Sequence, residues 1–262
     1  MTTNKFRYSV NRTTALADLC TPVSVYMRLR DTSPQSVLLE CSDYHDKANS
    51  RSFVCVNPIG SVSVRRGKVE FLYPDGTMST ADISGDYTCG MAINDFLGRF
   101  DIEGDSSCCC GLYGYTSFNA VRYFEDIAVK DEGADRNDAP DICYMLFRDV
   151  IEFEHFDNKM TVVTLAADGE DFTERVNRLM LRLSKGNINV YPFSRIGDVT
   201  SPLTDEEHKA NIRRGIAHCM RGDVFQVVLS RRFVQKYEGD DFALYRALRS
   251  INPSPYLFYF DF

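Results

Sequence analysis

The sequence lacks any apolar run that approaches the roughly 20 residues needed to span a bilayer. Its first ten residues, MTTNKFRYSV, contain no apolar segment of the signal-peptide type. A surplus of basic residues is also missing, because 37 acidic side chains outnumber 30 lysines and arginines and give a net charge of -7. These three absences argue against membrane, secreted and nucleic-acid-binding proteins. We therefore expect a cytoplasmic protein whose partners include neither a membrane nor a nucleic acid.

The sequence also lacks the spacing of a metal site. No pair of the nine cysteines is spaced as in a zinc site, and Cys108, Cys109 and Cys110 are consecutive, so their side chains cannot converge on one ion. We expect reduced cysteines that act as small apolar side chains. The glycines at Gly111 and Gly114 are not followed by the lysine and serine of a P-loop. The residues themselves predict neither a metal site nor a P-loop.

What the sequence does contain is the composition of an ordinary globular protein, with 44% hydrophobic and 26% charged residues. Alternating and apolar runs predict a strand at 37–40, successive antiparallel hairpins over 51–82, with separate strands at 53–56 and 62–64, and a strand pair within 142–166. Helical spacing and end signals predict helices near 21–30, 91–100, 172–185, 204–221 and 241–251. The predicted fold is α+β, with antiparallel β-sheets packed face to face and helices outside.

A linker is predicted over residues 187–203, which hold two prolines and one glycine. It would separate an N-terminal lobe, 1–186, from the beginning of a second lobe, 204–262. The last residues, 257–262, have a strand pattern that stops in mid-run, whereas natural chain ends are usually polar. We therefore expect that the natural protein continues beyond Phe262.

The stretch with the strongest local signals begins at Thr204, whose hydroxyl and the carboxylate of Glu207 form the pattern of a capping box. An apolar helix face ends at Gly222, and the apolar run 224–233 predicts a buried strand. Gln226 is the polar exception within that run. Two interpretations stay open: a core glutamine bonded to a neighbouring loop, or a site residue that faces a polar ligand.

Three segments carry a family resemblance. They are GDVFQVVLSRRF at 222–233 with NPSPY at 252–256, Leu38-Leu39-Glu40-Cys41-Ser42, and 114–125. Their order and spacing resemble component I of anthranilate synthase, in the chorismate-utilising enzyme family, over residues 21–262. The resemblance implies the N-terminal part of a lyase of tryptophan biosynthesis. Its substrates would be chorismate and ammonia from a glutamine amidotransferase subunit, component II, and its products anthranilate and pyruvate.

The same resemblance implies a site for tryptophan as feedback inhibitor. Glu40 would accept hydrogen bonds from its ammonium group, and Arg51 would support the pocket or pair with acidic groups. The strand that ends at Glu40 must then lie beside the strand that begins at Tyr256. The implied tryptophan-binding residues are Glu40, Cys41, Arg51, Pro255, Tyr256 and Leu257. Two of them depart from the family pattern, which has serine at Cys41 and methionine at Leu257. Taken alone, Glu40 would also suit a surface ion pair.

For catalysis the resemblance leaves one candidate, Gln226, where relatives that add water to chorismate carry a lysine. The family's Mg²⁺ ligands and catalytic histidine belong to a later stretch, so Mg²⁺ is expected in the intact enzyme with no ligand from this chain. We therefore expect this chain alone to be inactive. Two alternatives remain: component I of aminodeoxychorismate synthase, in folate synthesis, or a non-catalytic amino-acid-binding module.

Overall fold

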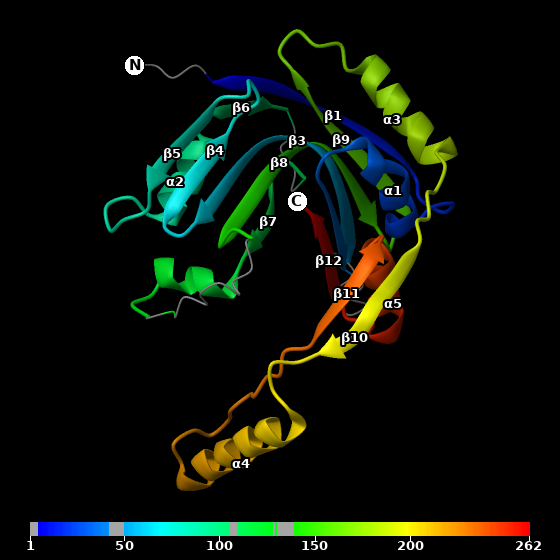
Figure 1. Cartoon of the computed structure of the whole chain (residues 1–262). Helices are drawn as coiled ribbons and strands as arrows, with labels where there is room; N and C mark the ends of the chain where they lie inside the picture. Colours follow the sequence, from blue (N-terminus) through cyan, green and yellow to red (C-terminus); the bar gives the residue numbers. More distant parts are fainter. Residues whose placement is uncertain (1–4, 42–49, 105–108, 128, 130–138) are drawn as a thin grey trace. The chain divides into compact units, whose positions relative to one another are not determined.

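The computed structural model describes residues 5–41, 50–104, 109–127, 129 and 139–262. Two compact units make up the chain (Figure 1). Unit 1 comprises Met1–Asn189 together with Pro253–Phe262, and unit 2 comprises Val190–Asn252. Helices flank largely antiparallel strands, which confirms the predicted α+β class. Ser42 and Asp43 of the Leu38 segment, Cys108, and the charged stretch 130–138 lie outside the described residues.

A ten-stranded sheet forms the body of unit 1. Its main path runs through β12 (Tyr256–Asp261), β2 (Ser36–Cys41), β3 (Arg51–Arg65), β8 (Ile142–Glu154), β9 (Lys159–Ala167), β1 (Phe6–Leu16) and β6 (Phe100–Glu103). A hairpin of β4 (Lys68–Leu72) and β5 (Met78–Asp82) extends from β3, and β7 (Leu112–Thr116) extends from β8. The pairs are antiparallel except that β1 and β6 run parallel.

The strands predicted at 53–56 and 62–64 are one bent strand, β3, so the expectation of two strands was wrong. Both parts pair with β8, and the register shifts between Pro58 and Gly60. This β-bulge bends the strand without ending it. Residues 53–56 of β3 pair with β2, and residues 61–65 pair with β4. The bend therefore divides the sheet into two halves.

The two halves of the sheet face each other across an apolar core. The ring of Tyr115 on β7 lies 5.9 Å from the ring of Phe260 on β12, and Tyr113 lies 6.1 Å from Phe53. Buried side chains of β2, β3, β8 and β9 fill the space between them. This contact supports the predicted face-to-face packing of β layers.

Helices cover the other faces of the sheet. Thr21 caps α1 (Pro22–Leu29) with a capping box, and the Tyr26 hydroxyl lies 2.9 Å from Ser36 Oγ on β2. Arg28 of α1 donates to the carbonyl groups of Leu183 and Gly186, and so holds the end of α3 (Thr173–Lys185). A second core packs α2 (Cys89–Leu97) against β3, β4 and β6. Two 3₁₀ turns, η1 (Arg30–Thr32) and η2 (Phe118–Tyr123), complete unit 1.

Unit 2 contains α4 (Asp205–Arg221), α5 (Phe242–Ile251) and a hairpin of β10 (Phe193–Thr200) with β11 (Val234–Gly239). The Thr204–Glu207 capping box and the left-handed Gly222, with φ 80°, are both present as predicted. Strand β10 lies inside the stretch 187–203 that we expected to be a linker. The compact units divide the chain at other places, since residues 253–262 belong to unit 1. The division into lobes 1–186 and 204–262 stays a prediction.

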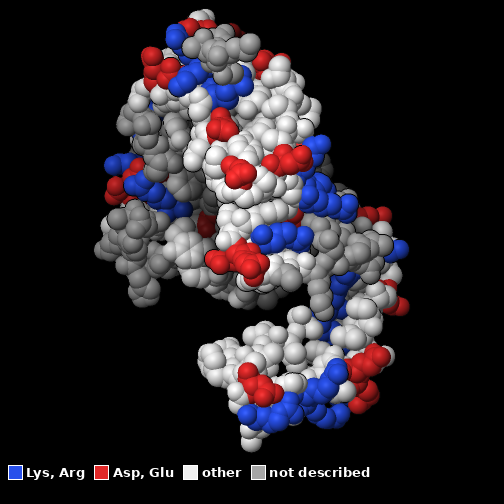
Figure 2. Space-filling model, turned by 90° about the vertical axis from the view of Figure 1, so that its left-hand side faces the viewer, with Lys and Arg blue, Asp and Glu red and all other residues white. Residues whose placement is uncertain are grey.

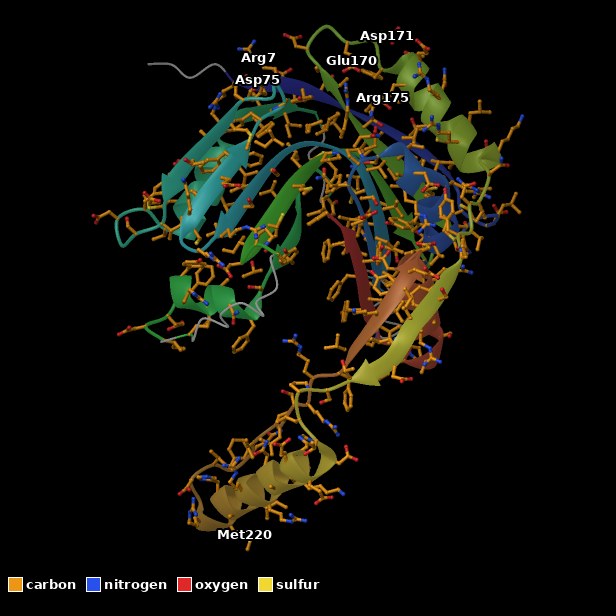
Figure 3. All side chains as sticks on the ribbon, in the orientation of Figure 1. Arg7, Asp75, Glu170, Asp171, Arg175 and Met220 are labelled. Atoms are coloured by element: carbon orange, nitrogen blue, oxygen red, sulfur yellow. The ribbon has the colours of Figure 1, made fainter. Side chains whose placement is uncertain are left out.

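The buried strand predicted at 224–233 is absent, which is a correction. These residues form no regular strand, and Phe225 is 99% and Val228 83% exposed. A strand forms only where a neighbour pairs with it, and the described part of the chain offers this run none. The apolar side of α4 is likewise exposed, and Met220 points away from the helix end in Figure 3. In Figure 2, the part that holds α4 carries its charged side chains along one margin and uncharged atoms along the other.

No helix among the described residues is long and apolar enough to cross a membrane.

Candidate functional site

The pairing of β12 with β2 brings together the two segments that the resemblance assigns to one pocket. The strands are antiparallel, with Leu257 opposite Glu40 and Tyr256 opposite Cys41. The predicted adjacency of these segments, from the two ends of the chain, is confirmed. Pro255 precedes β12 directly and is exposed.

Although adjacent, the predicted residues lie on two faces of the sheet. Side chains alternate along a strand, and cross-strand partners share a face. Leu39 packs into the core between the sheet halves, whereas Ser36 contacts α1 on the outer face. Cys41 and its partner Tyr256 therefore lie on the inner face. Glu40 and Leu257 lie on the outer face.

Arg51 belongs to the inner face, since Phe53 two residues later pairs with Leu39. Its guanidinium Nη1 donates to Oε1 of Glu152 at 2.8 Å. Arg51 is 37% exposed, whereas Glu152 is 1% exposed. The structure thus supports the second role predicted for Arg51, pairing with an acidic group.

Glu152 is a component of this region that sequence reasoning missed. The thiol of Cys109 donates to its Oε2 at 3.1 Å, and Arg12 Nη2 lies 4.0 Å from the same oxygen. The buried carboxylate therefore contacts side chains of β1, of β3 and of the segment before β7. The available signal was a glutamate between apolar residues in the run Val150-Ile151-Glu152-Phe153, since buried charges require partners.

The end of β2 is fixed by a second polar contact. The backbone N–H of Cys41 donates to Ser52 Oγ at 3.3 Å, and Ser52 Oγ lies 2.6 Å from His155 Nε2. Ser52 is fully buried. These bonds hold the Cys41 backbone against β3 and the residue that follows β8.

The inner face near Cys41 is built of apolar and aromatic side chains with buried thiols. Burial raises the pKa of Cys143 to about 11, partly offset by Arg65. Burial also raises the pKa of Cys55, with a smaller contribution from Cys109. These thiols stay protonated near neutral pH and serve as packing groups. The eight cysteines that the structure describes are all free thiols. The arrangement provides a guanidinium beside an apolar wall, which suits binding rather than bond cleavage.

Gln226, the predicted catalytic residue, lies in unit 2 and is exposed in the irregular stretch after α4. Its catalytic role stays a prediction. Mg²⁺ prefers several oxygen ligands, and no group of three or more His, Cys, Asp or Glu side chains gathers for a metal within the described ranges. The Mg²⁺ of the intact enzyme stays a prediction.

Comparison with known proteins gives the family. Residues 39–262 match the chorismate binding enzymes. The chain belongs to this family. Component 1 of anthranilate synthase from Thermus thermophilus is 31% identical over 262 residues, which cover 95% of this chain and 53% of that protein. The chloroplastic anthranilate synthase alpha subunit 2 of Arabidopsis thaliana is 33% identical over 171 residues, 58% of this chain and 28% of that protein.

A solved structure agrees on the fold. Anthranilate synthase component I from Streptococcus pneumoniae superposes with a TM-score of 0.59 at 20% identity, over 93% of this chain and 53% of that one. At this identity the likeness shows the fold alone. The chain spans about half the length of the relatives that it matches over most of its own length.

Proposed function

We propose that this chain is the N-terminal part of an anthranilate synthase component I. The whole enzyme would convert chorismate and glutamine-derived ammonia into anthranilate and pyruvate. The observation that carries the proposal is the β12–β2 register, which joins the Leu38–Cys41 and Tyr256–Leu257 segments in a chorismate binding enzyme. The names of the relatives favour this product over aminodeoxychorismate.

The role of unit 1 would be regulatory, with tryptophan as the inhibitor. Arg51, anchored by Glu152 yet partly exposed, would receive the tryptophan carboxylate. The inner-face aromatics Phe53 and Tyr113, whose rings pack on each other at 6.1 Å, would form one apolar wall against the indole. Glu40 is 8% exposed and lies on the opposite face from Cys41, so its carboxylate would reach the ammonium only around the end of β2.

The glutamine amidotransferase subunit and Mg²⁺ belong to the same proposal. Ammonia must come from a glutamine-hydrolysing partner if glutamine is the donor, and Mg²⁺ would be held by residues other than those described. The chorismate-binding role of Gln226 would likewise require further contacts, because its present segment is exposed.

Calorimetric titration of this chain with tryptophan tests the regulatory role. We expect binding of tryptophan in preference to phenylalanine, and at least about tenfold weaker binding by Glu40→Ala, since a charge-assisted hydrogen bond contributes roughly 1.5–3 kcal/mol. Glu70→Ala is the matched control, because Glu70 is an exposed glutamate on β4.

Equal affinity of wild type and Glu40→Ala would remove Glu40 from the site. A wild-type chain that binds no tryptophan would refute a tryptophan site in this chain. Loss of binding on Arg51→Ala with retention on Glu40→Ala would place the ligand on the inner face alone.

A further inference from the structure

A cavity lies in unit 1 where β3 bends. It has a volume of about 430 Å³ and is formed by β1, β3, β8, the stretch before β2 and the turn after β4. None of the residues assigned above to tryptophan or chorismate lines it. We call it the crease pocket.

The backbone beside the crease pocket is held in an unusual conformation. Asn57 has φ 61°, and the bulge that follows leaves Ile59 without an opposite residue on β8. The Asn57 side chain donates to Asp149 at 2.6 Å, and its backbone N–H donates to Ser33 Oγ at 2.7 Å. Left-handed non-glycine residues and bulges are enriched at ligand sites, because surrounding contacts must maintain their strain.

The walls of the crease pocket are mainly apolar. Three prolines contribute rigid surface that loses no side-chain freedom when a ligand binds. The volume lies near the lower end of the range of small-molecule sites, so a small ligand fits. The main apolar lining residues are Pro34, Pro58, Ile59, Leu72, Tyr73, Pro74 and Met145.

Arg148 is the one charged residue among those that line the cavity. Its Nε donates to the Leu165 carbonyl at 3.0 Å, and its Nη2 pairs with Glu170, which lies on the loop before α3 (Figure 3). A guanidinium has five N–H donors, so these two bonds leave others for a ligand. Burial, followed by the nearby charge of Arg175, lowers the pKa of Arg148. Its cation is thus poorly solvated where it stands.

Tyr8 is the second polar group at this end of the cavity. It is buried on β1 and lies close enough to Arg148 for the cation to affect its pKa, which burial raises. Its hydroxyl stays protonated at neutral pH and is available as a donor. A guanidinium and a phenol together favour a carboxylate over a neutral group.

We propose that the crease pocket binds a small aromatic or alicyclic carboxylate, with the carboxylate on Arg148 and Tyr8 and the ring among the prolines. No carboxylate is among the lining residues, and the Glu170 carboxylate beside Arg148 is already paired with that guanidinium, so the ammonium group of an amino acid would find no unpaired anion in the cavity. The ligand class is therefore a carboxylic acid without an amino group on the α-carbon. This site is independent of the tryptophan site.

Benzoate and its uncharged isostere benzamide are the probes, with affinities measured by ligand-detected NMR on the 262-residue chain. We expect benzoate to bind roughly tenfold more tightly than benzamide, and Arg148→Gln to abolish that difference. Arg178→Gln is the matched control, because it removes an exposed arginine of α3 that does not line the cavity. We expect it to change benzoate affinity less than about twofold.

A second variant tests the proposal independently, in case Arg148→Gln does not fold. Leu72→Trp adds a ring at a partly exposed lining position and leaves the Arg148–Glu170 pair intact. It should weaken benzoate binding by roughly tenfold by filling the cavity. Unchanged binding by this variant would overturn the assignment. Equal affinity for the two probes, no binding of either at millimolar concentration, or equal weakening by Arg178→Gln would also overturn it.

Tryptophan titration of Arg148→Gln separates this proposal from the regulatory one. We expect tryptophan affinity to be unchanged, since Arg148 lies outside the residues assigned to tryptophan. Absence of tryptophan binding in every variant would refute the regulatory proposal and leave the benzoate result unaffected. Parallel loss of tryptophan and benzoate binding in Arg148→Gln would overturn the independence of the crease pocket.

Discussion

Glu152 illustrates how one buried acid organises a surface that binds charged groups. The carboxylate alone is inside the protein, while the guanidinium groups of Arg12 and Arg51 remain partly exposed. An ionised carboxylate in that place would be very unfavourable without them. The same bonds fix Arg51 at the inner face, so a residue that no ligand touches would decide how a ligand carboxylate is received.

Replacement of Glu152 by glutamine should therefore affect both stability and binding. We expect a loss of about 1–3 kcal/mol in the free energy of unfolding, because hydrogen bonds to a charged group are lost while the arginines can still reach water. Urea denaturation measures the loss, and Glu154→Gln on the same strand is the control, expected within about 0.5 kcal/mol of wild type. If Glu152→Gln is as stable as Glu154→Gln, the carboxylate does not organise this region.

At the scale of elements, signals carried by a few neighbouring residues correctly predicted where helices begin and end. The proline and capping residue at the start of α1, the capping box of α4 and the left-handed Gly222 are all present. The bend of β3 was not predictable in this way, because the bulge depends on how β8 pairs with both parts of the strand. The strand predicted for the apolar run 224–233 was wrong for a related reason. Strand formation depends on neighbouring strands, which the composition of a run does not reveal.

The exposed run leads to a direct prediction. Val228→Ser should change the free energy of unfolding of this chain by no more than about 0.5 kcal/mol, because its side chain is already in water. Leu38→Ala, at a fully buried position of β2, should cost about 2–5 kcal/mol through lost burial and a cavity. Denaturation curves of the two variants measure the contrast. A large cost for Val228→Ser would show that the run is packed in solution.

At the scale of the whole molecule, the candidate tryptophan site joins residues that are distant in sequence. The chain leaves unit 1 after Asn189 and returns at Pro253 to place β12 beside β2. Family resemblance supplied the pairing of these two segments, and the topology confirmed it. The opposite faces of Glu40 and Cys41 follow from strand alternation alone. Which residues of β3 and β12 share each face could not be foreseen, because that depends on the register of β2 against both strands.

The last prediction concerns what the 262-residue chain does with chorismate. We expect no anthranilate from chorismate, ammonium and Mg²⁺, measured by fluorescence, with the Thermus thermophilus enzyme as a positive control. Gln226 stands in an exposed, unpaired stretch, and the described residues gather no metal-binding cluster. A reaction that must position chorismate and exclude water requires an enclosed, preorganised site, and an exposed amide does not provide one. Turnover by the chain would contradict this and would direct the search for catalytic groups to unit 1. Inactivity combined with selective tryptophan binding would assign regulation, separately from catalysis, to the part of the fold that β2 and β12 hold together.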